Sequence, residues 1–293
     1  MDTLDALEAR SIFLIREAYA ALPHVGMLWS AGKDSTVLLW LARKAFAGHV
    51  PFTLIHIDTS FKIPELIAYR DRLAAEWNLT LIYGQNRAAL EARQTFPDGT
   101  MTRLQCCGLL KTDALAATVS GEGPRYRFQP ATRAWEPDPD RTPFTGVIAG
   151  VRADEEGSRS KERYFSPRGA GHDWNVDDQP PELWSYFNTE VPPGGHVRVH
   201  PLLDWTELNI WEYIAREQIP TVSLYYDQGE GRRYRSLGCT PCTSMVTSTA
   251  RTPADIVEEL RTGQFSRVAE RSGRDQDRED GGGLETLRRG GYM

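Results

Sequence analysis

Apolar positions recur along the chain at two spacings, and the switch between them predicts alternating helices and strands. Apolar side chains at helical spacing over residues 4–21 predict an opening amphipathic helix. Beyond it, short apolar runs predict buried strands at 25–29, 52–57 and 80–83, with one helix ending near residue 46 and another over 64–76. Strands that alternate with helices indicate βαβ units and a parallel sheet.

The rest of the chain repeats this pattern less regularly. The predicted helices are 108–119, 206–217 and 253–261, and the predicted strands are 146–150 and 198–203. Irregular structure is predicted over 84–105, an exposed insertion over 121–145, a loop-rich stretch over 166–195 and a mobile loop over 272–283. We therefore predict an α/β fold with helices on both faces of a parallel sheet. One domain over 1–220 would be followed by a loop-rich C-terminal extension over 221–293.

A turn of small residues separates the first predicted strand from the helix after it. The sequence there, Ser30 to Ser35, reads S-A-G-K-D-S. Free backbone N–H groups and the positive end of the helix dipole would converge at such a turn and favour an anion such as phosphate. Lys33 would add a full positive charge. An ordinary βα turn with a chance lysine explains the same residues, so both interpretations stay open at this point.

Other charged residues follow strand ends, where ligands bind in parallel sheets. Arg152 comes just after the predicted strand 146–150 and could reach the same edge as Lys33. Arg159, Lys161 and Arg163 form a second basic group, which is either a phosphate-binding group or a solvated charged loop. Asp58 follows the second strand and could bind ribose or a metal ion, or it could cap a helix.

The four cysteines fall in two pairs, Cys106–Cys107 and Cys239–Cys242. Two pairs brought together would make a four-thiolate site that suits Zn²⁺ or an iron–sulfur cluster. The alternative is four ordinary buried thiols.

Composition narrows the class of protein without identifying it. The chain has 293 residues, a net charge of −6 and 40% hydrophobic residues, which is typical of a globular protein. Its acidic balance argues against a basic surface for nucleic acid, so such a partner would need a local patch. There is no run of about 18 apolar residues and no signal peptide at the N-terminus, so we expect a cytoplasmic protein without a membrane partner.

Together, these motifs resemble those of the phosphoadenosine-phosphosulfate reductase family of PP-loop ATP pyrophosphatases. The resemblance runs through S-A-G-K-D-S at 30–35, H-I-D-T at 56–59, G-V-R-A-D-E-E-G-S-R-S-K-E-R at 150–163 and L-G-C-T-P-C-T at 237–243. Within the family it is strongest to sulfate adenylyltransferase small subunits. It implies an adenine-nucleotide α-hydrolase-like (Rossmann-like) fold. It also implies ATP and Mg²⁺ as cofactors.

The resemblance also implies a set of site residues. The nucleotide-binding residues would be Ser30, Ala31, Gly32, Lys33, Asp34, Ser35 and Asp58. The catalytic residues would be Lys33, Asp34, Arg152, Arg159, Lys161 and Arg163. Cys106, Cys107, Cys239 and Cys242 would hold a [4Fe–4S] cluster, as in iron–sulfur adenylyl-sulfate reductases and DNA phosphorothioation sulfurtransferases. No cysteine follows Cys242, so the chain lacks the C-terminal catalytic cysteine of those reductases.

The expected reaction is attack of an oxyanion acceptor on the α-phosphate of ATP, with release of pyrophosphate. Our first hypothesis is a sulfur-incorporation enzyme of the DNA phosphorothioation type, acting on a DNA phosphate with a sulfur-donor protein. The alternative is a sulfate adenylyltransferase small subunit that makes adenylyl sulfate with a GTPase large subunit. A non-enzymatic subunit that only senses ATP is a third hypothesis. A homo-oligomer is compatible with each of the three.

Overall fold

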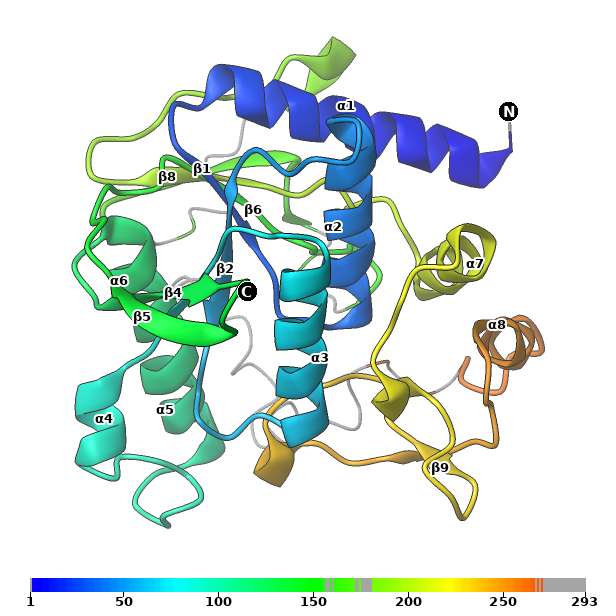
Figure 1. Ribbon diagram of the computed structural model, residues 1–293. Coiled ribbons are helices and arrows are strands. Elements are labelled where there is room, and N and C mark those ends of the chain that lie inside the picture. Colours follow the sequence, from blue (N-terminus) through cyan, green and yellow to red (C-terminus); the bar gives the residue numbers. More distant parts are fainter. Residues whose placement is uncertain are drawn as a thin grey trace.

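The fold is described from a computed structural model, which covers residues 2–155, 159, 161–171, 174, 181–266, 268 and 270. The strands of its main sheet are β1 Val25–Leu28, β2 Thr53–Ile57, β3 Leu81–Gly84, β4 Arg125–Gln129, β5 Ala134–Asp138, β6 Gly146–Ile148, β7 Phe165–Arg168 and β8 His196–Val199. They lie in the order β5-β4-β3-β2-β1-β6-β8-β7 (Figure 1). Strands β3, β2, β1, β6 and β8 pair in parallel, and β4, β5 and β7 are added antiparallel at the two edges.

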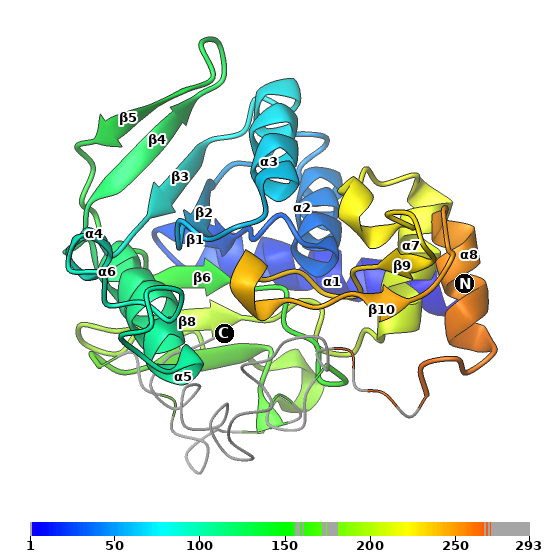
Figure 2. The ribbon, with the colours of Figure 1, turned by 90° about the horizontal axis from the view of Figure 1, so that it is seen from below.

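Helices cover both faces of this sheet (Figures 1 and 2). The α-helices are α1 Thr3–Ala21, α2 Lys33–Ala45, α3 Pro64–Glu76, α4 Arg87–Glu91, α5 Arg103–Cys107, α6 Ala114–Ser120, α7 Glu207–Glu217 and α8 Pro253–Arg261. Shorter elements are the π-helix η1 Gly108–Asp113, the 3₁₀ turns η3 Leu183–Ser185, η4 Ser223–Tyr225 and η5 Thr240–Cys242, and the small strand pair β9 Arg232–Arg233 and β10 Val246–Thr247.

Alternating side chains of each central strand enter two separate cores, because successive side chains of a strand point to opposite faces. Met27 of β1 and Leu54 of β2 pack in the larger core, with residues of α1, α2, α3 and α7. The next residue in each strand, Leu28 or Ile55, packs in the smaller core with Leu115 of α6. The central strands are therefore apolar on both faces, as expected for a parallel sheet that is covered on both sides.

The predicted fold class is confirmed, with helices over 64–76 and 253–261 at the predicted bounds. The sequence pattern missed three sets of elements: α4 and α5 in 84–105, the hairpin β4–β5 in 121–145, and β7. The hairpin is largely polar and is held by cross-strand rings, with Phe128 and Trp135 at 5.1 Å, so it lacks a hydrophobic period. Residues 108–119 form a π-helix followed by α6 rather than one regular helix.

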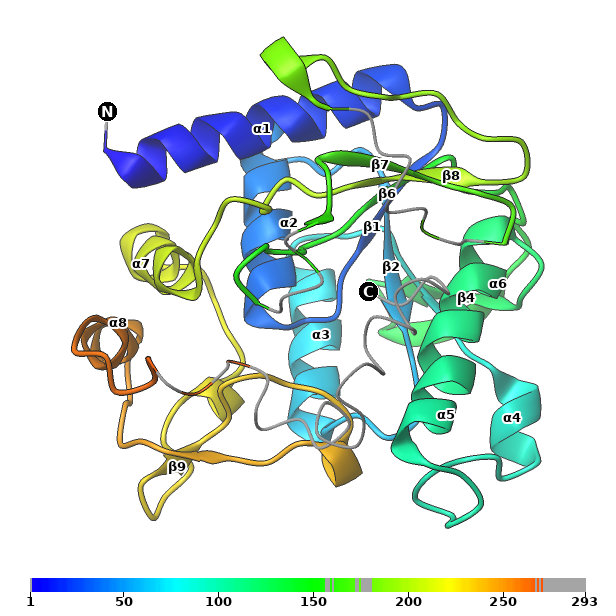
Figure 3. The same ribbon diagram turned by 180° about the vertical axis from the view of Figure 1, so that it is seen from behind.

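The C-terminal extension runs from η4 past β9 and η5, below α3 and toward α5 (Figure 3). The bridge between Lys62 and Cys239 ties it to the segment after β2. The boundary at residue 220 stays a prediction, and the loop predicted at 272–283 lies outside the described residues. Within the described ranges, no helix has both the length and the apolar character needed to cross a membrane.

Candidate functional site

The loop between β1 and α2 opens onto a cavity at the carboxyl ends of the parallel strands. Strand β1 lies between β2 and β6, the point where the strand order reverses and where open α/β sheets bind ligands. Helix α2 begins at Lys33, and its N-cap Gly32 provides no side-chain cap. Ser30, Gly32, Lys33, Asp34 and Ser35 all line the cavity. Ala31 is buried beside them in the left-handed region at φ 61°.

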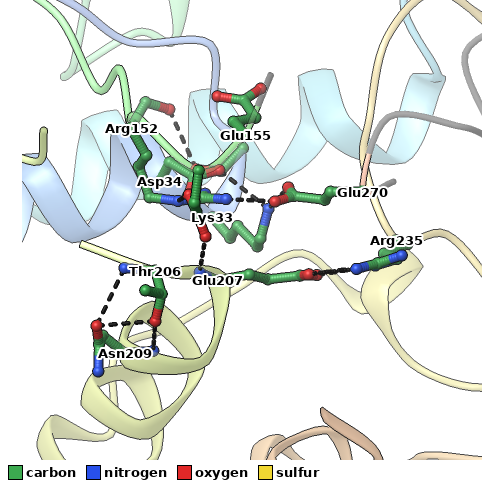
Figure 4. Close-up of polar contacts among 12 residues, drawn as sticks. Lys33, Asp34, Arg152, Glu155, Thr206, Glu207, Asn209, Arg235 and Glu270 are labelled. Carbon is green, nitrogen blue, oxygen red and sulfur yellow. Dashed lines mark hydrogen bonds and ion pairs between the residues drawn. The ribbon is translucent and has the colours of Figure 1, made fainter. Parts of the chain in front are cut away.

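A ring of four alternating charges fills the part of the cavity next to α2 (Figure 4). The ammonium of Lys33 pairs with Asp34 at 3.0 Å and also with the carboxylate of Glu270. The guanidinium of Arg152 pairs with the second oxygens of the same two carboxylates. Arg152 is fully buried, and its Nε also donates to Asp154 at 2.9 Å. Two cations are thus held side by side where an anion of several charges would fit.

The ion pairs keep both cations charged despite their burial. Burial by itself would lower the pKa of Lys33, but Asp34 and Glu270 outweigh it and raise that pKa above its ordinary value. The pKa of Arg152 is raised for the same reason. Burial would raise the pKa of Glu270, but Arg152 and Lys33 lower it to about 2. All three side chains are therefore ionised at neutral pH.

Apolar side chains form another wall of the same cavity. Leu28, Ile55 and Ile57 come from β1 and β2, and Leu115 comes from α6. The backbone at Gly150 lies close to the first turn of α2, since a Cβ added at Gly150 would be 3.3 Å from the amide nitrogen of Ser35. A cavity with an apolar wall beside a cationic end suits a molecule with a flat ring and a polyphosphate.

The structure separates the remaining predicted residues. Arg159 lines the cavity and pairs with Glu155. Among the described residues that line this cavity, Asp58, Lys161 and Arg163 do not appear. The Asp58 carboxylate accepts the N–H of Ser60 at 2.8 Å and so closes a turn, and it does not cap α3, whose N-cap is Ile63. Lys161 is exposed. The roles assigned to these residues stay predictions.

Tyr225 and Glu270 are cavity residues that were not predicted, and both reach Lys33 from the C-terminal extension. The hydroxyl of Tyr225 accepts the N–H of Lys33 at 2.9 Å, the first amide of α2. Glu270 reaches Lys33 from 237 positions away in sequence. Neither residue belongs to a local motif that marks a binding site, so the sequence offered no signal for them.

A second, smaller pocket brings the two cysteine pairs together. Cys106 and Cys107 come from α5, Cys242 comes from η5, and Cys239 is the N-cap of η5. Lys111 donates to Cys107 Sγ at 3.3 Å and also lines the larger cavity, so the two hollows adjoin. The predicted convergence of the two pairs is therefore present.

Two thiols of this pocket, those of Cys106 and Cys242, favour the neutral form. Burial, followed by nearby Cys239 and Cys107, raises the pKa of Cys242 to about 11, and burial also raises the pKa of Cys106. As the side chains stand, no three metal-ligating groups among the described residues are placed to hold a metal ion. Four thiols in one pocket are, however, the kind of donor set with which proteins hold iron–sulfur clusters.

Comparison with known proteins agrees with the motifs. The model of the phosphoadenosine phosphosulfate reductase domain matches residues 24–245. The sulfate adenylyltransferase subunit 2 of Geotalea daltonii is 37% identical, covering 99% of this chain and 98% of that protein. The protein of the same name from Azospirillum brasilense is 38% identical, with the same coverage. Phosphoadenylyl-sulfate reductase from Candida auris is a structural neighbour at 16% identity and a TM-score of 0.49, covering 84% of this chain and 98% of that one.

Proposed function

The chain belongs to the phosphoadenosine phosphosulfate reductase domain family, and from this membership we propose that it is an ATP-using adenylyltransferase of sulfur metabolism. We propose further that its acceptor is sulfate. The similarity to sulfate adenylyltransferase subunit 2 extends over nearly the whole chain and supports sulfate over the DNA phosphate of our first hypothesis. The comparisons thus favour what the sequence offered as the alternative.

The observation that carries the proposal is that Lys33 and Arg152 lie side by side at the start of α2, each paired with Asp34 and Glu270. In the proposed reaction a sulfate oxygen attacks the α-phosphorus of ATP. The bond from that phosphorus to the oxygen bridging to the β-phosphorus breaks, and pyrophosphate leaves with the electron pair. Negative charge grows on the leaving group, and two buried cations already held in position would stabilise it.

Other groups at the cavity have narrower roles in this proposal. The apolar wall from Leu28 to Leu115 would hold the adenine ring, and Mg²⁺ would accompany the phosphates of ATP. Arg159, beside Glu155, would face the incoming sulfate. The relatives are named subunit 2, which indicates that another subunit exists. We propose that for this chain a GTPase large subunit completes the enzyme.

We also propose that Cys106, Cys107, Cys239 and Cys242 hold a [4Fe–4S] cluster. The support is the donor set, four thiols from two segments in one pocket. When bound, such a cluster supplies electron-transfer or sulfur chemistry next to the nucleotide. The chain's own contribution is the neighbouring Lys111, whose ammonium would offset the negative charge of four thiolates.

Pyrophosphate release from ATP and Mg²⁺ tests the acceptor directly. The chain would be assayed alone and with its proposed large subunit and GTP, using pyrophosphatase to pull the reaction forward. We expect release that depends on sulfate and does not respond to chloride at equal ionic strength. Release that responds to duplex DNA and not to sulfate would contradict the proposal and restore the DNA hypothesis.

A further inference from the structure

The carboxylate of Glu270 is held in the cavity by contacts that begin several residues earlier in the chain. Arg235 donates to the backbone oxygen of Val268 at 2.7 Å, and its guanidinium lies 4.7 Å from the Phe265 ring. Glu207 fixes Arg235 with contacts of 3.1 and 2.6 Å to its two carboxylate oxygens (Figure 4). Residues that follow α8 are thereby anchored beside α7, two positions before Glu270.

Glu270 occupies the position that the cations of the loop offer to an anion. Its side chain is 6% exposed, and its two oxygens pair separately with Lys33 and Arg152. Phosphate oxygens would accept hydrogen bonds from the same ammonium and guanidinium groups, because both cations bind carboxylate and phosphate oxygens. The carboxylate and a phosphate group therefore compete for one set of donors.

Of the two carboxylates in the ring, Glu270 is the one whose backbone does not belong to the loop and α2. Asp34 is the second residue of α2, and its position is set by the helix that begins at Lys33. Glu270 belongs to a different part of the chain, 118 positions from Arg152. Nearby Glu155 adds to this, because its carboxylate raises the electrostatic cost of keeping Glu270 charged there.

We propose that Glu270 is a built-in competitor for the phosphate site. It neutralises and aligns Lys33 and Arg152 while no nucleotide is bound, and the pyrophosphate part of ATP must displace it. The inference rests on the proposed nucleotide site and adds a regulatory step to it. Anything that holds Glu270 in place lowers the affinity for nucleotide, and anything that withdraws it raises that affinity.

Calorimetric titration of the full chain with inorganic pyrophosphate tests this without any reaction. If Glu270 fills the site about nine-tenths of the time, its removal tightens pyrophosphate binding about tenfold. We expect that tightening for Glu270→Gln both in EDTA and in Mg²⁺. Glu270→Asp keeps the charge but shortens the side chain, so it should tighten binding by less.

The matched control is Glu259→Gln. Like Glu270→Gln, it removes a carboxylate that pairs with a buried arginine, in this case Arg233 of the extension. Glu259 pairs with Arg233 at 2.9 Å, and neither residue lines the cavity as described. Its pyrophosphate affinity should stay within about twofold of the unmodified chain. Circular dichroism and urea unfolding of each variant would establish that it is folded before titration.

Unchanged binding in both Glu270 variants would overturn the inference. Weaker binding of Glu270→Gln confined to Mg²⁺ would also overturn it, because Glu270 would then be a metal ligand. These results leave the proposed function standing, since the unmodified chain still binds pyrophosphate. Absence of binding in every variant and in the unmodified chain would remove the proposed nucleotide site, and the inference with it.

Discussion

The cation-lined cavity at α2 and the thiol pocket beside it differ in charge. Each is built from residues before position 220 together with residues of the C-terminal extension. In the cavity, Lys33 and Arg152 are ionised and already paired with carboxylates of the chain itself. In the thiol pocket, Cys106 and Cys242 have raised pKa values and favour the neutral form. The cavity therefore carries its charges without a ligand, whereas two of the four thiols in the pocket favour the uncharged form.

This difference agrees with the ligands that we propose for the two sites. An anion site needs buried cations, and buried cations are stable only when paired, so the chain supplies its own carboxylates. A metal-cluster site needs thiolates, whose mutual repulsion in a buried pocket is relieved by protonation until iron arrives. If both proposals hold, ligand binding at the anion site must displace Glu270, and cluster binding at the thiol pocket must release protons.

Removing the charge of Lys33 should have the largest effect. Lys33→Met takes away one of two cations that face the leaving group, so we expect pyrophosphate release to fall about 100-fold to 1000-fold. Lys44→Met is the matched control, because it removes the same charge from the same helix at a partly exposed pair with Glu8. Steady-state release with saturating ATP measures both. Equal activity of the two variants would place the anion site elsewhere.

The cysteines should separate the two sites. Cys239→Ser combined with Cys242→Ser removes one wall of the thiol pocket, so iron bound after anaerobic purification should fall from about four atoms per chain to nearly none. Because these thiols do not pair with Lys33 or Arg152, pyrophosphate release should fall less than about tenfold. Thr240→Ser, on the same turn, is the control. A serine variant that keeps its iron, or a colourless unmodified chain, would remove the cluster from the proposal.

The sequence predicted the parts of each site that are local and left out those that are not. Ser30 to Ser35 could be recognised because a strand, a turn and a helix follow one another there. The cysteine pairs could be predicted as one site because each pair is already assembled in sequence, although only the fold brings α5 against η5. Glu270 and Tyr225 had no such signal, since a single carboxylate or hydroxyl in a polar segment has no period or spacing.

The smallest effect concerns Tyr225, whose hydroxyl accepts the N–H of Lys33 in the absence of nucleotide. Tyr225→Phe leaves that buried donor without its partner, which should lower the free energy of unfolding by about 1–3 kcal/mol. A phosphate oxygen can take over the same N–H, so saturating pyrophosphate should shrink the loss. Urea unfolding with and without pyrophosphate measures both values.

Tyr226→Phe provides the comparison for this measurement. Its hydroxyl lies 2.6 Å from Thr221 Oγ1, so the substitution also removes one hydrogen bond, but it does so away from the cavity. Its cost should be the same with and without pyrophosphate. If pyrophosphate changes the unfolding free energies of both variants equally, the first amide of α2 does not bind phosphate. The contrast between a preformed anion site and an unformed thiol site would then lose the contact at Lys33 as evidence.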